Sequence, residues 1–321
     1  MAIFTGTVKI LGGTETVTQK KEFYYGLIQK NVLVTGANGQ LGSELKALTK
    51  RMNVPFRFIF SDIDTLDILN EGQVIDFVLQ HGVEYVINCA AYTAVEKAET
   101  DPDKAYEINC TGVENLAKAA KRHPLRIIHI STDYVFDGLA AMPYKETDHP
   151  QPLSVYGRTK LAGENILKQT TPDWITLRTS WLYSEYGSNF VKTMLRLMNE
   201  RDELQVVDDQ RGTPTYAGDL AEMIVHVLQF SEEKEWKPGL YHFSNSGETT
   251  WYGFAAKIKE LSGNTSCVIH PVTTAEYKTE ASRPAYSVLD KSKIKSAFQV
   301  VIPQWEDSLA RCLKNLANQP E

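Results

Sequence analysis

Short apolar runs alternate with amphipathic stretches through the first half of the chain. Residues 31–34 hold three large aliphatic side chains in four positions, a run too short for a helix and typical of a buried strand. Leu41, Leu45 and Leu48 then recur at helical spacing and predict an amphipathic helix. The same alternation predicts strands at residues 56–61, 84–91 and 126–132 and helices at residues 74–80 and 115–121.

Four strand–helix alternations predict an α/β fold with a doubly wound parallel sheet of the Rossmann type. On such sheets, ligands bind at the carboxyl ends of the strands. Thr35, Asp62, Ala90 and Thr132 all fall at predicted strand ends. Their convergence indicates a binding site at one edge of the sheet.

The last third of the chain is less regular. Residues 174–181 predict a further strand that leads to an aromatic residue. Amphipathic helices are predicted at residues 220–228, 251–261 and 305–316, and Trp251 belongs to the buried stripe of the second. We expect these pieces to form a smaller, mixed lobe that binds the substrate and faces the nucleotide site.

This pattern divides the chain into three segments. Residues 30–182 are expected to form a dinucleotide-binding Rossmann domain, completed by roughly residues 216–242. Residues 183–321 mostly form the substrate-binding lobe, interleaved with that domain. Residues 1–29 lack a sustained hydrophobic period and the apolar core of a signal peptide, so we expect a poorly ordered extension or a start codon assigned too early.

Three glycines, Gly36, Gly39 and Gly42, stand between the first strand and the first helix. Such a turn directs backbone N–H groups and a helix N-terminus at one point, which favours a pyrophosphate group. Their spacing of three residues differs from the Gly-x-Gly-x-x-Gly of the usual dinucleotide fingerprint. From the residues alone, phosphate binding and an ordinary turn both remain open.

Asp62 ends the second predicted strand, about 20 residues beyond Gly42, where an acidic side chain can bind the adenosine ribose. Its carboxylate would repel a 2′-phosphate, which favours NADH over NADPH. The alternative is that Asp62 only caps the following turn.

Candidate chemistry lies at Tyr156 and Lys160, which are four residues apart and share one face of a predicted helix. A free tyrosine has a pKa near ~10, and a nearby ammonium group stabilises the phenolate and lowers that pKa. The phenol can then donate a proton to an alkoxide that forms from a ketone. The Thr132 hydroxyl, at the end of a strand, is placed to polarise the same oxygen. A surface tyrosine beside a solvated lysine is the alternative.

Composition narrows the class of protein. The chain has 321 residues, of which 42% are apolar and 23% charged, as in ordinary globular proteins. A net charge of −6 argues against nucleic acid as a main partner. No run approaches the ~18 apolar residues of a membrane span. Four cysteines without a Cys-x-x-Cys pair indicate a reducing cytoplasm, and seven histidines without metal-ligand spacing argue against a protein-built metal site.

Together, the glycine turn at residues 36–42, Thr132 and the Tyr156-x3-Lys160 pair resemble the extended short-chain dehydrogenase/reductases. Six further stretches are similar to the dTDP-4-dehydrorhamnose reductase family, and the likeness covers roughly residues 30–316. These stretches lie at residues 88–99, 131–138, 178–183, 212–215, 241–245 and 281–287.

The resemblance implies reduction of the C4 ketone of dTDP-4-dehydro-β-L-rhamnose by NADPH or NADH, the last step of dTDP-L-rhamnose synthesis for cell-surface polysaccharide. It also implies a cytoplasmic enzyme, either a monomer or a homodimer. Some members use Mg²⁺ in assembling a dimer, but no motif here supports a metal site.

The resemblance further assigns roles to single residues. The resemblance places the cofactor pyrophosphate at the glycine turn. It places the adenosine beside three residues that follow the second strand, and the nicotinamide near the third and fourth strands. These residues are Gly36, Gly39, Gln40, Leu41 and Gly42; Asp62, Asp67 and Ile68; and Ala91, Tyr92, Thr93 and Ile130.

Tyr156 is the implied proton donor, and Lys160 tunes it and binds the nicotinamide ribose. The implied substrate contacts are Thr132, Asp133 and Trp181 on the sugar, with Asn189 and Arg283 on the diphosphate. A solvated surface arginine would give the same pattern at Arg283.

Three other functions compete with this interpretation. A sugar-nucleotide 4,6-dehydratase or epimerase shares the scaffold, but a dehydratase typically carries Asp-Glu after the threonine, and Thr132 is followed here by Asp133 and Tyr134. A non-catalytic regulatory subunit of methionine adenosyltransferase would be favoured by loss of Tyr156 or Lys160, and both are present. A reductase of another 4-keto-6-deoxy sugar nucleotide stays open, because one hydroxyl changes few contacts.

Overall fold

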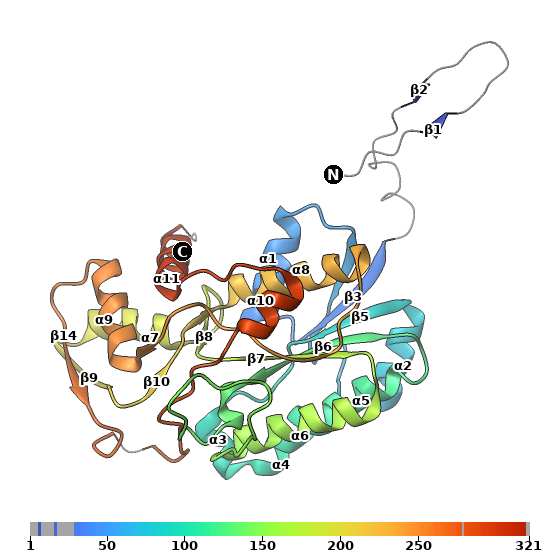
Figure 1. The fold of residues 1–321 in the computed structure, drawn as a ribbon. Coiled ribbons are helices and arrows are strands. Elements are labelled where there is room, and N and C mark those ends of the chain that lie inside the picture. The colour runs from blue at the N-terminus through green and yellow to red at the C-terminus, as the bar shows by residue number, and fades with distance from the viewer. Residues whose placement is uncertain (1–5, 8–15, 18–28, 278, 319–321) are drawn as a thin grey trace.

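A six-stranded parallel sheet forms the centre of the structure (Figure 1). Its strands run in the order β12-β7-β6-β5-β3-β4, and every neighbouring pair is parallel. The chain moves outward from β3 to β4 and then returns to the other side of β3, so a topological switch point lies between β3 and β5. The strands are β3 (Lys30–Thr35), β4 (Phe56–Phe60), β5 (Val83–Asn88), β6 (Arg126–Thr132), β7 (Trp174–Thr179) and β12 (Gly239–His242).

Helices cover both faces of this sheet, because successive strand residues point to opposite sides. Val32 and Val34 pack into one core, beneath α1 (Gln40–Arg51), α8 (Ala217–Glu233) and α10 (Ser292–Phe298). Leu33 packs into the other, against α2 (Glu71–Gln80), α5 (Gly112–Ala119) and α6 (Val155–Thr170). The predicted doubly wound Rossmann-type sheet is confirmed.

The computed structural model describes residues 6–7, 16–17, 29–277 and 279–318. The expectation of an extension over residues 1–29 therefore falls almost entirely outside the described residues. Within it, β1 (Gly6–Thr7) and β2 (Thr16–Val17) pair antiparallel. Among the described helices, none has the length and apolar character needed to cross a membrane.

A smaller mixed lobe follows β7. It contains a second apolar core that includes Val191, Met194, Phe254, Ile258 and Leu309. Two parallel pairs, β9–β14 and β8–β11, and one antiparallel pair, β10–β13, connect its pieces. Its elements are β8 (Leu182–Tyr183), α7 (Phe190–Glu200), β9 (Glu203–Val207), β10 (Arg211–Gly212), β11 (Thr215–Tyr216), β13 (Thr249–Thr250), α9 (Trp251–Ser262), β14 (Val268–Val272) and α11 (Trp305–Ala317).

The ends of several elements differ from the prediction. The third predicted strand, residues 84–91, stops at Asn88, because the small residues after it form a loop instead of continuing the ladder. Between β5 and β6 the chain forms α3 (Val95–Thr100), α4 (Pro102–Tyr106) and a π-helical turn at Glu107–Thr111 that leads into α5. The predicted helix at residues 115–121 therefore begins earlier, at Gly112, and ends at Ala119.

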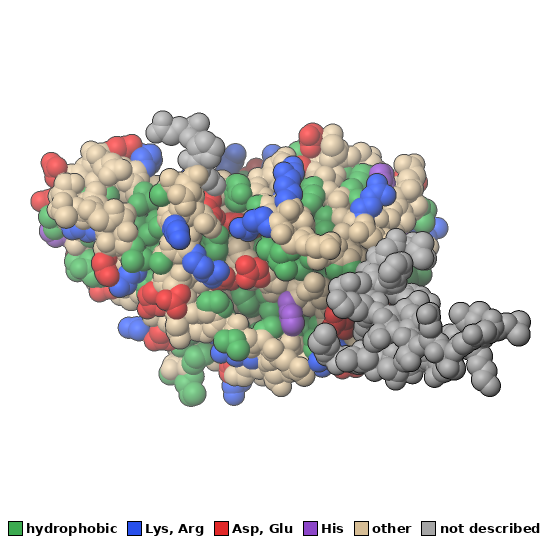
Figure 2. Space-filling model, turned by 90° about the horizontal axis from the view of Figure 1, so that it is seen from above, with side chains coloured by type: hydrophobic (Ala, Val, Ile, Leu, Met, Phe, Trp, Pro, Cys, Tyr) green, Lys and Arg blue, Asp and Glu red, His purple; other side chains and the backbone are tan. Residues whose placement is uncertain are grey.

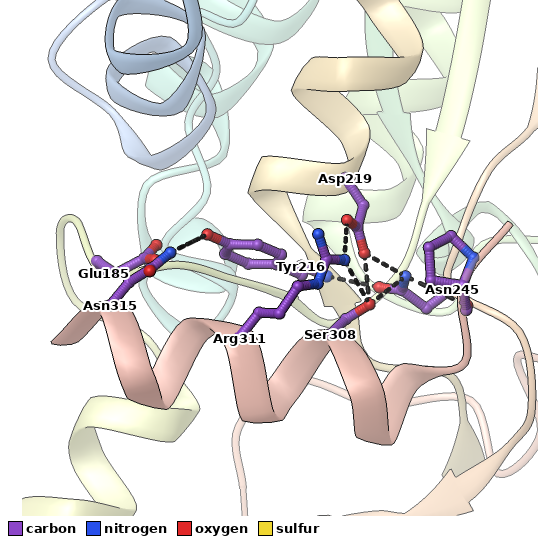
Figure 3. Close-up of polar contacts among 8 residues, drawn as sticks. Glu185, Tyr216, Asp219, Asn245, Ser308, Arg311 and Asn315 are labelled. Carbon is purple, nitrogen blue, oxygen red and sulfur yellow. Dashed lines mark hydrogen bonds and ion pairs between the residues drawn. The ribbon is translucent and has the colours of Figure 1, made fainter. Parts of the chain in front are cut away.

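Seen from above, Lys and Arg side chains are interspersed with Asp and Glu on the described surface (Figure 2). Beneath it, a buried network fastens the C-terminal helix α11 to the first turn of α8 (Figure 3). Asp219 accepts hydrogen bonds from Asn245 Nδ2 at 2.6 Å and Ser308 Oγ at 2.5 Å, and it forms an ion pair with Arg311. The network thus satisfies a carboxylate that is only 4% exposed.

Asp219→Asn should destabilise the protein by about 2–4 kcal/mol, because it leaves Arg311 without its counter-charge and places an amide against buried donors. The change in free energy of unfolding can be measured by urea titration. Glu233→Gln, at the exposed end of the same helix, is the matched control and should change stability by less than about 0.5 kcal/mol. Equal effects of the two substitutions would contradict the structural role of the network.

Candidate active site

A cavity of about 520 Å³ opens at the carboxyl ends of β3, β5, β6 and β7. The glycine turn, the start of α6 and the loop after β7 all contribute to its wall. Most of the predicted site residues line it: Gly36, Gly39, Gln40, Leu41, Gly42, Ala91, Thr93, Ile130, Thr132, Asp133, Tyr156, Lys160, Trp181 and Asn189.

The glycine turn brings backbone, not side chains, to the cavity. Gly36 has φ +62°, and a Cβ there would lie 2.6 Å from the backbone nitrogen of Ala90. A Cβ on Gly42 would lie 2.6 Å from the Gly36 carbonyl oxygen. Gly39 is the N-cap of α1, and no side-chain hydrogen bond among the described residues caps this helix. The amide groups of its first turn are therefore available to an anion.

A second cavity continues from the same turn toward the end of β4. It shares Gly36 and Gly39 with the first cavity and extends to Asp62, Asp67 and Ile68. Two cavities that meet at an anion-binding turn fit an elongated dinucleotide with its pyrophosphate at the centre. The residues present therefore suit a nicotinamide cofactor.

Asp62 both stabilises the glycine turn and lines the second cavity. Its Oδ2 accepts a hydrogen bond from the Asn38 backbone N–H at 2.8 Å, and its Oδ1 accepts one from the Ile63 N–H at 2.9 Å. The side chain also lines the adenosine-side cavity. Turn capping and ribose binding, set as alternatives from the sequence, are thus compatible.

Tyr156 and Lys160 lie on the first two turns of α6, and both line the cavity. Ser154 caps this helix by accepting a hydrogen bond from the Gly157 N–H at 3.1 Å. Lys160 Nζ donates to the Ile130 carbonyl oxygen at 2.7 Å, which anchors α6 to β6. The helix start and the strand end are therefore fixed relative to each other.

Burial sets the proton affinity of the pair. It raises the pKa of Tyr156 to about 12, and a hydrogen bond with Thr132 only partly opposes this. Burial also lowers the pKa of Lys160 to about 8, although the negative charge of Glu164 partly opposes this shift. The sequence predicted a tyrosine pKa lowered by the ammonium group, whereas in the structure burial and the nearby Asp133 carboxylate raise it. A phenol that stays neutral at pH 7 is suited to donate a proton.

Asp133 presents an unsatisfied acceptor beside this pair. Its Oδ1 accepts a hydrogen bond from Thr132 Oγ1 at 3.1 Å, whereas Oδ2 is buried with no partner among the described residues. Burial raises the pKa of Asp133 to about 6, and the nearby hydroxyls of Ser287 and Thr132 oppose this shift only in part. A sugar hydroxyl could satisfy the free oxygen.

A buried ion pair lies behind the catalytic groups, and the sequence pattern did not reveal it. Glu164, one turn after Lys160, accepts two hydrogen bonds from Arg178 on β7, at 2.9 and 2.7 Å. Its Oε1 also accepts a hydrogen bond from Ser131 Oγ at 2.5 Å, next to Thr132. The side chains are only 8% and 2% exposed. One carboxylate therefore joins α6, β6 and β7.

Asn109, on the π-helical turn, was also missed by the sequence interpretation. Its Oδ1 accepts a hydrogen bond from the Tyr92 N–H at 2.9 Å, and its Nδ2 donates to the Tyr92 carbonyl at 3.1 Å and to Thr159 Oγ1 at 3.0 Å. It thereby fixes the loop after β5 against α6. The Tyr92 side chain packs with Ala98 and Ala105, outside the residues that line the two cavities, so its predicted nicotinamide contact stays a prediction.

Asn189 connects the two halves of the cavity. It caps α7 by accepting a hydrogen bond from the Lys192 N–H at 3.1 Å, and it donates to Gln40 Oε1 at 3.0 Å. The glycine turn is thus tied directly to the lobe that carries Trp181.

Arg283 lies apart from the catalytic cavity. It lines a neighbouring cavity with Phe190 and Gln210, and it forms an ion pair with Glu96 on α3. Tyr134 and Trp251 line both cavities, so the two spaces adjoin.

The described part of the chain holds no group of three or more His, Cys, Asp or Glu side chains arranged to bind a metal ion.

Comparison with known proteins gives consistent matches over nearly the whole chain. The sequence model of the family described as RmlD substrate binding domain matches residues 30–318. The dTDP-4-dehydrorhamnose reductase of Aggregatibacter actinomycetemcomitans is 44% identical over 292 residues, which are 89% of this chain and 97% of that protein. The enzyme of the same name from Escherichia coli K12 is 41% identical over 89% of this chain and 98% of its own length.

A solved structure agrees. The crystal structure of dTDP-4-dehydrorhamnose reductase from Bacillus anthracis in complex with NADP has a TM-score of 0.84 and 40% identity. The match covers 90% of this chain and 100% of that one.

Glu164→Ala should lower the free energy of unfolding by about 3–5 kcal/mol, because it leaves the Arg178 guanidinium buried without a counter-charge. Glu200→Ala is the matched control: it breaks an exposed Glu–Arg pair of 2.7 Å and should cost about 0.3–0.5 kcal/mol. Urea unfolding measures both. Similar losses of unfolding free energy in the two variants would show that the buried pair is no more important for stability than an exposed one.

Proposed function

Since the chain belongs to the RmlD substrate binding domain family, whose named relatives are dTDP-4-dehydrorhamnose reductases, we propose that it catalyses the same reaction. It reduces the C4 ketone of dTDP-4-dehydro-β-L-rhamnose to dTDP-L-rhamnose with NADPH or NADH. This is the last step of dTDP-rhamnose synthesis for cell-surface polysaccharide. The observation that carries the proposal is the convergence of Thr132, Tyr156 and Lys160 on one cavity with the glycine turn.

The nicotinamide, when bound, supplies a hydride to the carbonyl carbon. Tyr156 then gives its phenolic proton to the developing alkoxide, so that hydride and proton together complete the alcohol. Thr132 polarises the carbonyl oxygen. Lys160, held at the Ile130 carbonyl and with a pKa of about 8, still carries a proton at pH 7 and stabilises the phenolate left behind.

The two adjoining cavities support a division of labour for the substrate. Asp133 and Trp181 face the sugar in the catalytic cavity. Asn189 contacts the diphosphate near the glycine turn, and Arg283 contacts it from the neighbouring cavity. In this proposal residues 30–182 with 216–242 hold the dinucleotide, and residues 183–321 mostly hold the sugar nucleotide.

The chain acts in the cytoplasm as a monomer or homodimer in this proposal. Its four cysteines, all within the described residues, are free thiols, as expected in a reducing compartment.

This chain lacks the catalytic base that a dehydratase on the same scaffold would need. Position 134, after Asp133, is a tyrosine whose ring packs edge-on against Tyr156 with centroids 5.5 Å apart. No carboxylate follows Asp133 at the place where the elimination needs one. The presence of Tyr156 and Lys160 in the cavity likewise favours catalysis over a purely regulatory subunit.

The wild-type chain should oxidise NADPH or NADH with the dTDP-4-keto sugar in preference to its UDP and GDP analogues. Tyr156→Phe should lower turnover by about 10²–10⁴-fold with substrate binding largely kept, because only the proton donor is lost. Tyr106→Phe, at a half-exposed tyrosine of α4, is the control. Near-normal turnover of Tyr156→Phe would refute the mechanism.

Asp62→Ala should raise the ratio of kcat/KM for NADPH to that for NADH by about tenfold, because a charged hydrogen bond to the ribose is worth about 1.4 kcal/mol or more. The carboxylate would also no longer repel a 2′-phosphate. Asp64→Ala removes an exposed carboxylate two residues away and should leave the ratio unchanged. An unaltered ratio in Asp62→Ala would remove this residue from the cofactor site.

A further inference from the structure

Trp181 lies in the wall of the catalytic cavity with an unusual backbone conformation. It follows β7 with φ 46°, in the left-handed region that a bulky side chain rarely adopts. Two hydrogen bonds hold this turn: Ser180 Oγ donates to the Thr213 carbonyl at 2.7 Å, and the Thr215 N–H donates to the Trp181 carbonyl at 3.1 Å. Such a conformation persists only where the surroundings fix it.

The indole of Trp181 is covered on one face by Trp251. The two rings stack with centroids 3.7 Å apart and an interplanar angle of 10°. Phe190 in turn supports Trp251, with centroids 4.7 Å apart. The sequence placed Trp251 in the buried stripe of its helix, but in the structure it is half-buried and lines the cavity.

Gly212 covers the other face. A Cβ on Gly212 would lie 2.6, 2.7 and 2.8 Å from Cε2, Cζ2 and Nε1 of Trp181, so it would stand over the ring and not at its edge. Its three nearest atoms all belong to Trp181, although Trp251 lies only 3.7 Å beyond one face. Gly212 must therefore be on the face opposite Trp251.

The paired strands β10 and β13 position both Gly212 and Trp251. Gly212 belongs to β10, which pairs antiparallel with β13, and Trp251 follows β13 directly as the first residue of α9. Gly212 faces Thr249 across this pair. Thr250 caps α9 by accepting a hydrogen bond from the Gly253 N–H at 3.0 Å, which fixes the start of the helix. The β10–β13 pair thus acts as a clamp on Trp181.

We propose that Trp251 is a positioning residue for the reaction: with Gly212, it clamps the Trp181 indole so that only its edge faces the sugar. This inference rests on the proposed function for the identity of the sugar. With the indole held, the sugar ring meets a rigid wall opposite Tyr156 and Thr132 and cannot tilt. Trp251 also lines the cavity that contains Arg283, so the same residue borders both spaces.

The stack can be observed without any substrate. Two stacked indoles couple their transitions and give an exciton couplet in the far-ultraviolet circular dichroism of the full chain. Trp251→Phe and Trp181→Phe should both abolish the couplet. Trp236→Phe should retain it, because Trp236 packs against Tyr85, at the amino-terminal part of β5 and away from the cavity.

Trp251→Ala should raise KM for the sugar nucleotide by about tenfold and lower kcat, with KM for NADPH within about twofold, since an aromatic pair contributes up to about 1.5 kcal/mol. Trp251→Phe keeps a flat ring and should restore most of this loss. Gly212→Ala tests the opposite face: its methyl group displaces the indole and should impair the sugar parameters in the same way. If Trp251→Ala fails to fold, the other two variants carry the test.

Two results would overturn the proposal. One is a Trp251→Phe circular dichroism difference spectrum no larger than that of Trp236→Phe, which would mean that the two indoles do not couple in solution. The other is that both sugar parameters stay within twofold of wild type in Trp251→Ala, or in Gly212→Ala if Trp251→Ala does not fold. If instead the wild type reduces no dTDP-4-keto sugar, the proposed function fails, but the couplet and its response to Trp251→Phe still report on the clamp.

Discussion

The carboxylate of Glu164 is the point on which the catalytic geometry depends. It binds Arg178 through two hydrogen bonds and Ser131 through a third, and the ion pair is almost fully buried. Because it lies one turn after Lys160, the ion pair determines how far α6 stands from the ends of β6 and β7. Thr132 is the last residue of β6, and Trp181 follows the end of β7. Buried ion pairs are costly to desolvate, so this pair is better understood as a device for specific geometry than as a source of net stability.

The remainder of the site is arranged around a turn made of backbone. Close contact of Gly36 with Ala90 brings the ends of β3 and β5 together at the topological switch point, where doubly wound sheets bind ligands. Cavities extend from this turn in both directions, toward Asp62 and toward Tyr156. Asn189 then links Gln40 to the sugar-binding half. Cofactor and substrate are therefore held by elements that contact each other directly.

Local pattern was enough to predict the sheet and the convergence of side chains at its edge. The run at residues 31–34, the leucines of α1 and the Tyr156–Lys160 spacing each depend on neighbours within a few residues. Glu164 with Arg178, Asn109 with Tyr92, and Gly212 with Trp181 are contacts between distant segments, and no periodicity marks them. The pKa of Tyr156 was misjudged for the same reason, since it depends on how much of the fold surrounds the phenol.

The π-helical turn at Glu107–Thr111 limits how many residues this segment of the chain can gain or lose. A π turn holds one residue more than the α-helical turn it replaces, and each residue of an α-helix rotates the next side chain by about 100°. Deleting one residue between α4 and Asn109 would restore a regular helix and rotate the amide away from Tyr92 and Thr159. The contacts of Asn109 therefore fix the number of residues in the segment from α4 to α5. An insertion or deletion in this segment would be less tolerated than one in an exposed helix.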